Sequence, residues 1–247
     1  MTFLFYLFTG KRSLPTFLIL VLAGLFTALG IWQLSRWQEH ETDRRVIQAD
    51  FAEPALSWNE FQASPLGFLH RRVTVWGYFD PRHRMILRDQ SFEGVPGAHE
   101  LTPFFPDGSK TAVLVDRGWF PASDEGALAK LAQIPLPHGR VELKAALQAP
   151  QKVSSFWAKL RADDPNRWYL VDLPKIAQTL PYPLAPVWLA LLPSRSGGVW
   201  PKPLALALPE SLNNLSYTFQ WFAFALIAVI GYGIYQRKVW KKSRPQG

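Results

Sequence analysis

The stretch that decides the fold of this chain covers residues 13–35 and reads SLPTFLILVLAGLFTALGIWQLS. It contains no Asp, Glu, Lys or Arg. A second uncharged stretch, residues 211–236, reads SLNNLSYTFQWFAFALIAVIGYGIYQ. Each is longer than the roughly 20 residues that a helix needs to cross a bilayer. The sequence therefore predicts two transmembrane helices around a central domain of residues 36–210, with short tails at 1–12 and 237–247.

The charges of the two tails indicate how the chain crosses the membrane. Both tails hold only basic charged residues, since all 19 acidic residues of the chain lie between them. Lys and Arg beside a span mark its cytoplasmic side, so we expect both termini in the cytoplasm and the central domain outside. Basic tails can also bind nucleic acid. Because these tails directly abut the predicted spans, a topology signal explains their charges better, and contact with anionic lipid headgroups is a second effect.

The central domain is predicted to be mainly antiparallel β structure. Runs rich in β-branched and aromatic residues predict strands at 72–79, 84–88, 101–105, 111–115, 140–145, 167–171 and 187–192. The first two strands flank a turn at 80–83 and are expected to form a hairpin. The next two flank Pro106, Asp107 and Gly108, which suit a second hairpin turn.

A few short helices and connections complete the predicted domain. Ser123 and Asp172 can each cap a short helix. Residues 41–50 and 54–64 are expected to form connecting helix and loop, and the proline-rich segment 181–209 an extended return to the membrane. The predicted fold class is an α+β membrane protein, with two transmembrane helices flanking a mainly antiparallel β domain.

Sequence motifs of enzymes and metal sites are missing. The chain has no G-x-S-x-G, no H-E-x-x-H and no glycine-rich phosphate loop. It has no cysteine and two methionines, and so few of the soft ligands that select Cu(I). The histidines lack the spacing of metal ligands and are predicted to be surface or turn residues: His40, His70, His83, His99 and His138. We expect a non-enzymatic protein without a metal, although acid–base chemistry by dispersed carboxylates stays open.

Two groups of aromatic and polar residues stand where each span meets the outer face. Their members recur at spacings of three and four, so each group shares one side of its helix. The groups are Trp32, Gln33, Arg36 and Trp37 on the first helix, and Tyr217, Gln220, Trp221 and Phe224 on the second. An aromatic belt with an anchoring arginine is one interpretation. A surface that faces a partner or cofactor is the other, because amides near hydrocarbon usually face protein or water.

The two helices are expected to pack against each other. Small residues on each helix permit a close approach: Gly24, Ala28, Ala223, Gly231 and Gly233. We expect Gln33 and Arg36 to face Tyr217 and Gln220, because a charge at the edge of hydrocarbon needs a partner.

Several motifs occur along the chain in a recognisable order. They are LGIWQLSR at 29–36, RVTVWGYF at 72–79, LVDRGWFP at 114–121, NRWY at 166–169 and NNLSY at 213–217. Together they resemble the surfeit locus protein 1 family, the cytochrome c oxidase assembly factors, over nearly the whole chain. The resemblance implies a role in assembling haem–copper oxidase, around delivery or insertion of haem a into its large subunit.

The resemblance also implies partners, a location and site residues. The expected partners are the oxidase large subunit, haem a synthase and the lipid membrane, with haem a bound transiently and no nucleic acid. The expected location is a bacterial inner membrane with a periplasmic domain. In the signature at 114–121, Gly118 can adopt an unusual backbone angle and Trp119 can anchor the core. Arg117 can form an ion pair or contact a partner. A packed corner of the β domain is the alternative.

The chain departs from the family pattern at two membrane-proximal positions. The pattern has histidine where this chain has Asn214, and often lysine where it has His40. The first departure removes the imidazole that the second helix would offer to haem iron, so contact would use propionates, aromatic packing or a ligand from another chain.

Four other classes of protein fit a two-span layout. A sensor would need an output domain, and only a short basic tail follows the second span. A membrane-anchored regulator of surface polysaccharide should show long heptad helices in residues 36–210, which instead read as strands. An extracytoplasmic ligand-binding protein and a tethered hydrolase remain open alternatives.

Overall fold

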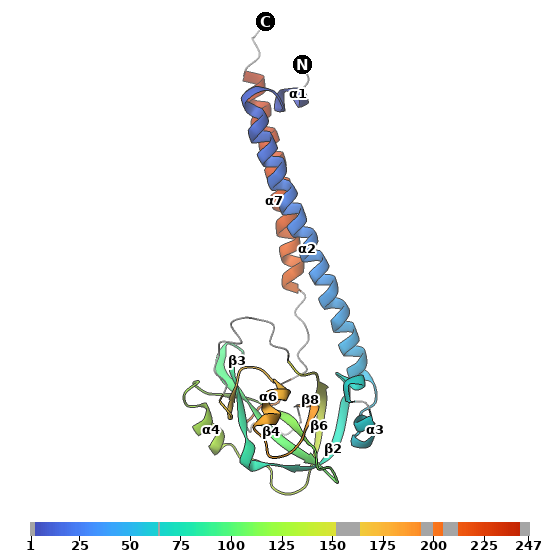
Figure 1. The fold of residues 1–247 in the computed structure, drawn as a ribbon. Helices are drawn as coiled ribbons and strands as arrows, with labels where there is room; N and C mark the ends of the chain where they lie inside the picture. Colours follow the sequence, from blue (N-terminus) through green and yellow to red (C-terminus); the bar gives the residue numbers. More distant parts are fainter. Residues whose placement is uncertain (1–2, 64, 152–163, 194–199, 205–211, 243–247) are drawn as a thin grey trace. The chain divides into compact units, whose positions relative to one another are not determined.

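The computed structural model describes residues 3–63, 65–151, 164–193, 200–204 and 212–242 (Figure 1). The chain divides into two compact units: Met1–Val46 with Leu208–Gly247, and Ile47–Ala207. The first unit is helical and contains α1 (Phe3–Leu7), the 3₁₀ turn η1 (Gly10–Arg12), most of α2 (Ser13–Ala52) and α7 (Leu212–Lys242).

The second unit holds all of the β structure that is described. Its strands are β1 (Leu56–Ser57), β2 (Arg72–Phe79), β3 (Met85–Phe92), β4 (Val95–Pro106), β5 (Ala112–Pro121), β6 (Val141–Gln148), β7 (Arg167–Trp168) and β8 (Leu184–Leu191). Its short helices are α3 (Trp58–Ala63), η2 (Pro65–Phe68), η3 (Pro81–His83), α4 (Ala127–Gln133) and α6 (Leu173–Gln178). The predicted class, two apolar helices flanking a mainly antiparallel β domain, is confirmed.

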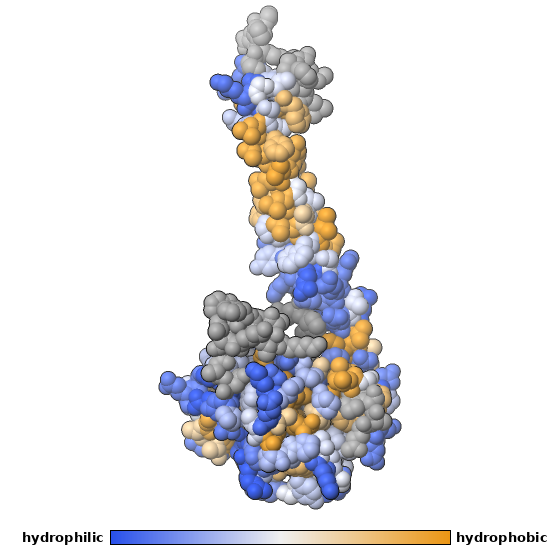
Figure 2. All heavy atoms as spheres, viewed as in Figure 1, coloured by the Kyte–Doolittle hydropathy of each residue, from blue (hydrophilic) through white to orange (hydrophobic). Residues whose placement is uncertain are grey.

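Helices α2 and α7 are long and apolar enough to cross a membrane. Figure 2 shows hydrophobic residues gathered along this helix pair, with hydrophilic residues toward its ends. Helix α2 is continuous for 40 residues, so it runs well past the predicted end of the span at residue 35. Residues 37–52 contain no Gly or Pro and include several good helix formers (Gln, Glu, Arg and Ala), which explains why the helix continues to Ala52.

The two long helices meet along a regular seam. On α2 the less exposed side chains include a series at every three or four positions: Thr16, Ile19, Ala23, Phe26, Gly30, Gln33, Trp37 and His40. On α7 the corresponding series is Asn214, Thr218, Trp221, Ala225, Ala228, Tyr232 and Gln236. An average spacing of about 3.5 residues is the geometry of a left-handed helix pair. We call these two sets the helix seam.

Ring contacts and one close approach hold the seam together. The Phe26 ring lies 5.6 Å from the Trp221 ring, and a Cβ at Gly30 would stand 2.7 Å from the Phe222 ring. By contrast, Gly24, Gly231 and Gly233 have nothing within 4 Å of an added Cβ, and Ala28 and Ala223 are exposed. The prediction that these five small residues form the contact is therefore wrong, because the 3.5-residue period leads the seam through Gly30 instead.

Five strands of the second unit close into a barrel. Strand β2 pairs with β6, β6 with β8, β8 with β5, β5 with β4, and β4 with β2 again. All of these pairs are antiparallel except β5 with β8. Inward side chains alternate along the strands, as a half-buried sheet requires; they include Val73, Val75, Phe104, Val115 and Leu189.

One predicted hairpin is confirmed and the other is wrong. Strands β4 and β5 pair around the predicted turn, with Phe104 opposite Val113. Strands β2 and β3 do not pair with each other, because both pair with the long strand β4: Phe79 lies opposite Phe104, and Met85 opposite Leu101. Between them the chain makes the 3₁₀ turn η3, which carries it from one partner position on β4 to the next.

Two further cores flank the barrel. Helix α6 covers Met85, Leu87, Leu101 and Leu114, and helix α4 covers Ile86, Ala98 and Phe120. Asp172 caps α6 as predicted, accepting a hydrogen bond from the Lys175 amide.

The expectations for Ser123 and for residues 181–209 need correction. Helix α4 begins at Ala127 with Gly126 as its cap, so Ser123 stands one turn too early and its hydroxyl accepts from the Gly126 amide. The segment 181–209 contains β8, which pairs with β5 and β6 in the barrel, and is therefore no simple return to the membrane. Its residues 194–199 and 205–209 lie outside the described part of the chain.

Candidate functional site

Polar side chains gather at one end of the helix seam. The His40 Nδ1 and the Asn214 Nδ2 lie 3.2 Å apart, so a hydrogen bond joins α2 to α7. One and two turns earlier on α2, Trp37 and Gln33 occupy the same seam, and the Gln33 Oε1 is buried without a hydrogen-bond partner. A buried amide oxygen without a hydrogen-bond partner destabilises the folded state. A hydrogen-bond donor from another molecule would remove this penalty.

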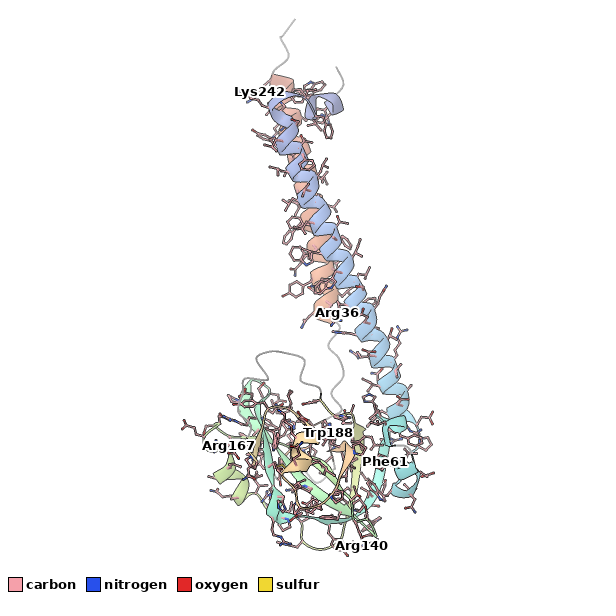
Figure 3. The ribbon with its side chains drawn as sticks, viewed as in Figure 1. Arg36, Phe61, Arg140, Arg167, Trp188 and Lys242 are labelled. Atoms are coloured by element: carbon pink, nitrogen blue, oxygen red, sulfur yellow. The ribbon has the colours of Figure 1, made fainter. Side chains whose placement is uncertain are left out.

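The predicted pairing of Arg36 with Tyr217 and Gln220 is wrong. Arg36, labelled in Figure 3, forms an ion pair with Glu39 on its own helix at 2.8 Å. Tyr217 and Gln220 are exposed and lie beside the seam rather than in it. The 3.5-residue period explains this result, since it selects Gln33 but skips Trp32 and Arg36.

The predicted patch is thus divided between two surfaces. Gln33, Asn214 and Trp221 belong to the seam. Trp32 and Tyr217, which are 55% and 50% exposed, belong to the outside of the helix pair.

In the β domain, Arg117 takes part in a buried ion cluster. Its Nη1 donates to the Glu100 Oε2 at 2.7 Å, and the Arg84 Nε donates to the Glu100 Oε1 at 2.9 Å. Thr102 donates a third bond to the same carboxylate. Glu100 is fully buried and Arg117 is 8% exposed. Arg84 and Arg117 also donate to the carbonyls of Ile134 and Pro135, so the cluster fixes the segment after α4.

Gly118 and Trp119 hold a second segment in place. Gly118 has a φ of 122°, and a Cβ there would stand 2.2 Å from the Lys202 carbonyl oxygen. The backbones of Trp119 and Lys202 exchange two hydrogen bonds, and the Trp119 ring packs against the rings of Trp200 and Phe92. The LVDRGWFP signature therefore forms a packed corner, in which the glycine makes room for residues 200–204.

A third cluster was missed by the sequence reasoning. The His99 Nδ1 lies 2.7 Å from the Asp116 Oδ2, and the Asp116 Oδ1 accepts from the Gly118 amide. His99 is therefore a largely buried strand residue, contrary to the prediction that it lies on the surface or in a turn. His99 and Asp116 are 17 positions apart, and only the pairing of β4 with β5 brings them together.

A fourth cluster lies at the turn η3. Asp80 accepts hydrogen bonds from the Arg82 amide and the Tyr182 hydroxyl, and its Oδ2 lies 2.7 Å from the His83 Nδ1. Burial tends to raise the pKa of the Asp80 carboxyl, but these hydrogen bonds outweigh it and hold that pKa below its ordinary value. Burial and the bond to Asp80 raise the pKa of Tyr182.

Comparison with known proteins identifies the family to which this chain belongs. A family model described as the SURF1 family matches residues 20–226, which include most of α2, the first half of α7 and the whole β domain. The chain belongs to the SURF1 family. Members of this family are membrane-anchored and are known generally as oxidase assembly factors.

Individual members of the SURF1 family resemble the chain along most of its length. A SURF1-like protein of Rickettsia bellii is 30% identical over 244 residues, which cover 94% of this chain and 92% of that protein. A SURF1-like protein of Rickettsia felis is 28% identical over 233 residues, covering 90% and 96%. An uncharacterized SURF1-like protein of Mycobacterium tuberculosis is 26% identical over 216 residues, covering 85% and 77%.

Proposed function

We propose that this chain is an assembly factor for haem–copper oxidase that assists the delivery or insertion of haem a into the large subunit. The observation that carries the proposal is the match to the SURF1 family along both helices and the β domain. The helix seam supports it, because an imidazole, two amides and an indole gather at one end of the seam.

Haem a would be the cargo of this protein, and the seam offers groups that suit it. Haem iron commonly takes an imidazole, which the amide of Asn214 cannot replace. His40 lies within hydrogen-bond distance of Asn214 from the opposite helix. We propose that His40 supplies the imidazole that α7 lacks in this chain. A ligand from another chain is then not needed.

Arg36 is proposed to bind a haem propionate or an acidic group of the oxidase. Its side chain is 47% exposed, and the side chain of its partner Glu39 is 58% exposed. Such surface ion pairs contribute little stability, and their partners exchange easily. The Arg36 guanidinium could then form two parallel hydrogen bonds with a carboxylate of the haem or of the oxidase. The protein would act by binding and positioning, without catalysing a reaction of its own.

The proposed topology places the β domain in the periplasm of a bacterium. The basic ends of the chain support cytoplasmic termini, because Lys and Arg beside spans stay inside. Reporter fusions at Gly247 should be active only in the cytoplasm, and fusions at Arg117 only in the periplasm. A fusion at Gly247 that is active outside would refute this orientation.

The function is tested by replacing His40 in cells that lack the wild-type gene. The variant His40→Gln should lower the haem a content of the assembled oxidase while the protein accumulates normally. His138→Gln is the matched control, because His138 is exposed on the β domain. The purified protein from cells that make haem a should show a haem absorption spectrum that His40→Gln loses. Full haem a occupancy in the deletion strain itself, without a second copy of the gene, would reject the proposed function.

The variant Arg36→Ala addresses the second proposed contact. It should reduce oxidase maturation at a normal level of inserted protein, because the propionate or acidic partner loses its guanidinium. Unchanged maturation would assign Arg36 and its neighbouring tryptophans to an aromatic belt.

A further inference from the structure

A cavity of about 220 Å³ lies on the outer face of the barrel, at the level of His99 and Asp116. Strands β3, β4, β5, β6 and β8 contribute to its lining, together with Gln151 and Leu204. Its walls are largely apolar and include Leu87, Trp188 (labelled in Figure 3) and Leu191. This volume is smaller than the 300–1,000 Å³ or so of pockets for drug-sized ligands, so it suits a single ring.

One of the polar side chains that line the cavity has an unsatisfied donor. The Gln148 Nε2 is buried and has no hydrogen-bond partner. The carboxylate of Asp116 is already occupied, because one oxygen accepts from the Gly118 amide and the other is paired with the His99 ring. An amide donor that is buried without an acceptor is costly, so the group best suited to it is an acceptor oxygen on a ligand.

The charges around the cavity argue for an uncharged ligand. Among the described lining residues there is no Lys or Arg to neutralise a carboxylate or a phosphate. A cationic ligand would compete with His99 for the single carboxylate. Because burying an unpaired charge is expensive, the ligand should be neutral, mainly apolar and equipped with a carbonyl-type oxygen.

The fold holds one wall of the cavity in place. Leu204 follows Lys202, whose backbone exchanges two hydrogen bonds with Trp119. Gly118, which also lines the cavity, leaves the space that lets this segment approach. The corner formed by the LVDRGWFP signature therefore also shapes the cavity.

We propose that this cavity binds the ring of a quinone-type molecule, with one carbonyl oxygen accepting from Gln148. A substituted quinone ring is flat, uncharged and apolar on its faces, and it carries acceptor oxygens at its two ends. His99 also lines the cavity and would offer its second ring nitrogen to a hydroxyl of the reduced form. The proposal concerns binding alone and is independent of the proposed role in oxidase assembly.

The probe for this proposal is duroquinone, the tetramethyl benzoquinone. Full substitution of its ring prevents addition of nucleophiles. Binding to the purified full-length chain in detergent is measured by equilibrium dialysis, with durene as the matched hydrocarbon without oxygens. Duroquinone should bind saturably and durene at least about fivefold more weakly, the ratio expected for one hydrogen bond.

Two variants test the site itself. Gln148→Met should raise the Kd of duroquinone about fivefold to tenfold and raise the melting temperature of the free protein, because it removes an unsatisfied donor. Ala190→Leu fills the cavity and should abolish binding without altering a polar group. Gln178→Met, at an exposed position of α6, is the control and should change neither quantity.

Three results would each overturn the proposal. They are the absence of saturable binding to the unmodified chain, equal affinity for durene, and an unchanged Kd in the folded Gln148→Met and Ala190→Leu variants. If Gln148→Met does not fold, Ala190→Leu and the durene comparison still decide the question.

Discussion

The two units of this protein bury polar groups of different kinds. In the β domain, the carboxylates of Glu100, Asp116 and Asp80 are each held by two or more hydrogen bonds. In the helix seam the polar groups are uncharged amides, hydroxyls and an imidazole, and the Gln33 Oε1 has no partner. This difference indicates that the charged clusters stabilise the domain, whereas the uncharged Gln33 in the seam, like Gln148 in the domain, leaves hydrogen-bonding capacity for another molecule.

The largest effect is expected at the centre of the charged clusters. Glu100→Gln removes the charge that neutralises Arg84 and Arg117, and breaking a buried ion pair costs about 3–5 kcal/mol. The melting temperature of the domain should fall by about 10 °C, measured by near-ultraviolet circular dichroism of the full chain. Glu142→Gln, at an exposed position of β6, should leave it nearly unchanged. A loss below about 1 kcal/mol at Glu100 would contradict the stabilising role of the cluster.

The next effect is expected at the packed corner. Gly118→Ala places a Cβ at a residue with positive φ and against the Lys202 backbone. It should lower the free energy of unfolding by about 3 kcal/mol. Gly139→Ala is the matched control: its φ is also positive, at 78°, but an added Cβ meets nothing within 4 Å. The control should lower the free energy of unfolding by about 1 kcal/mol, from backbone strain alone. Equal losses in urea unfolding would show that contact with residues 200–204 contributes nothing.

A smaller and pH-dependent effect is expected at Asp80. Asp80→Asn should cost about 1–2 kcal/mol at neutral pH, because it weakens hydrogen bonds to a charged acceptor. The pKa of Asp80 is lowered in the folded state, so its contribution is present above about pH 4 and is lost as the pH falls through the folded value.

Unfolding measured in urea from pH 3 to pH 7 checks this prediction. The difference between the Asp80→Asn variant and the unmodified protein should shrink at the acid end. Asp107→Asn breaks an exposed ion pair with Arg140 and should have an effect below about 1 kcal/mol. A difference at Asp80 that stays constant over this range would show that its ionisation is not coupled to folding.

The smallest effect on stability is expected in the seam. Gln33→Leu removes an amide whose oxygen has no partner, so thermal stability in detergent should change by less than about 1 kcal/mol, or rise. The haem a content of the oxidase should nevertheless fall in cells that carry this variant. Gln220→Leu, at an exposed position of α7, serves as the control. A large loss of stability at Gln33 would break the contrast between the two units.

The sequence by itself determined the features that depend on local pattern. Uncharged stretches of sufficient length predicted both membrane helices, since length and hydropathy are local properties. Alternation of residue type predicted most strands, and the Pro-Asp-Gly turn predicted the hairpin of β4 and β5. Asp172 was predicted as a helix cap because capping involves only neighbouring amides.

Tertiary structure alone decided which elements meet. The hairpin of β2 and β3 failed because strand pairing depends on the long strand β4, which the local sequence of either partner does not reveal. Arg36 was misplaced because the side of a helix that faces a neighbour follows the shared 3.5-residue period rather than polarity. The clusters around Glu100 and Asp116 join residues on different strands, and their formation depends on a register that is fixed only when the whole barrel closes.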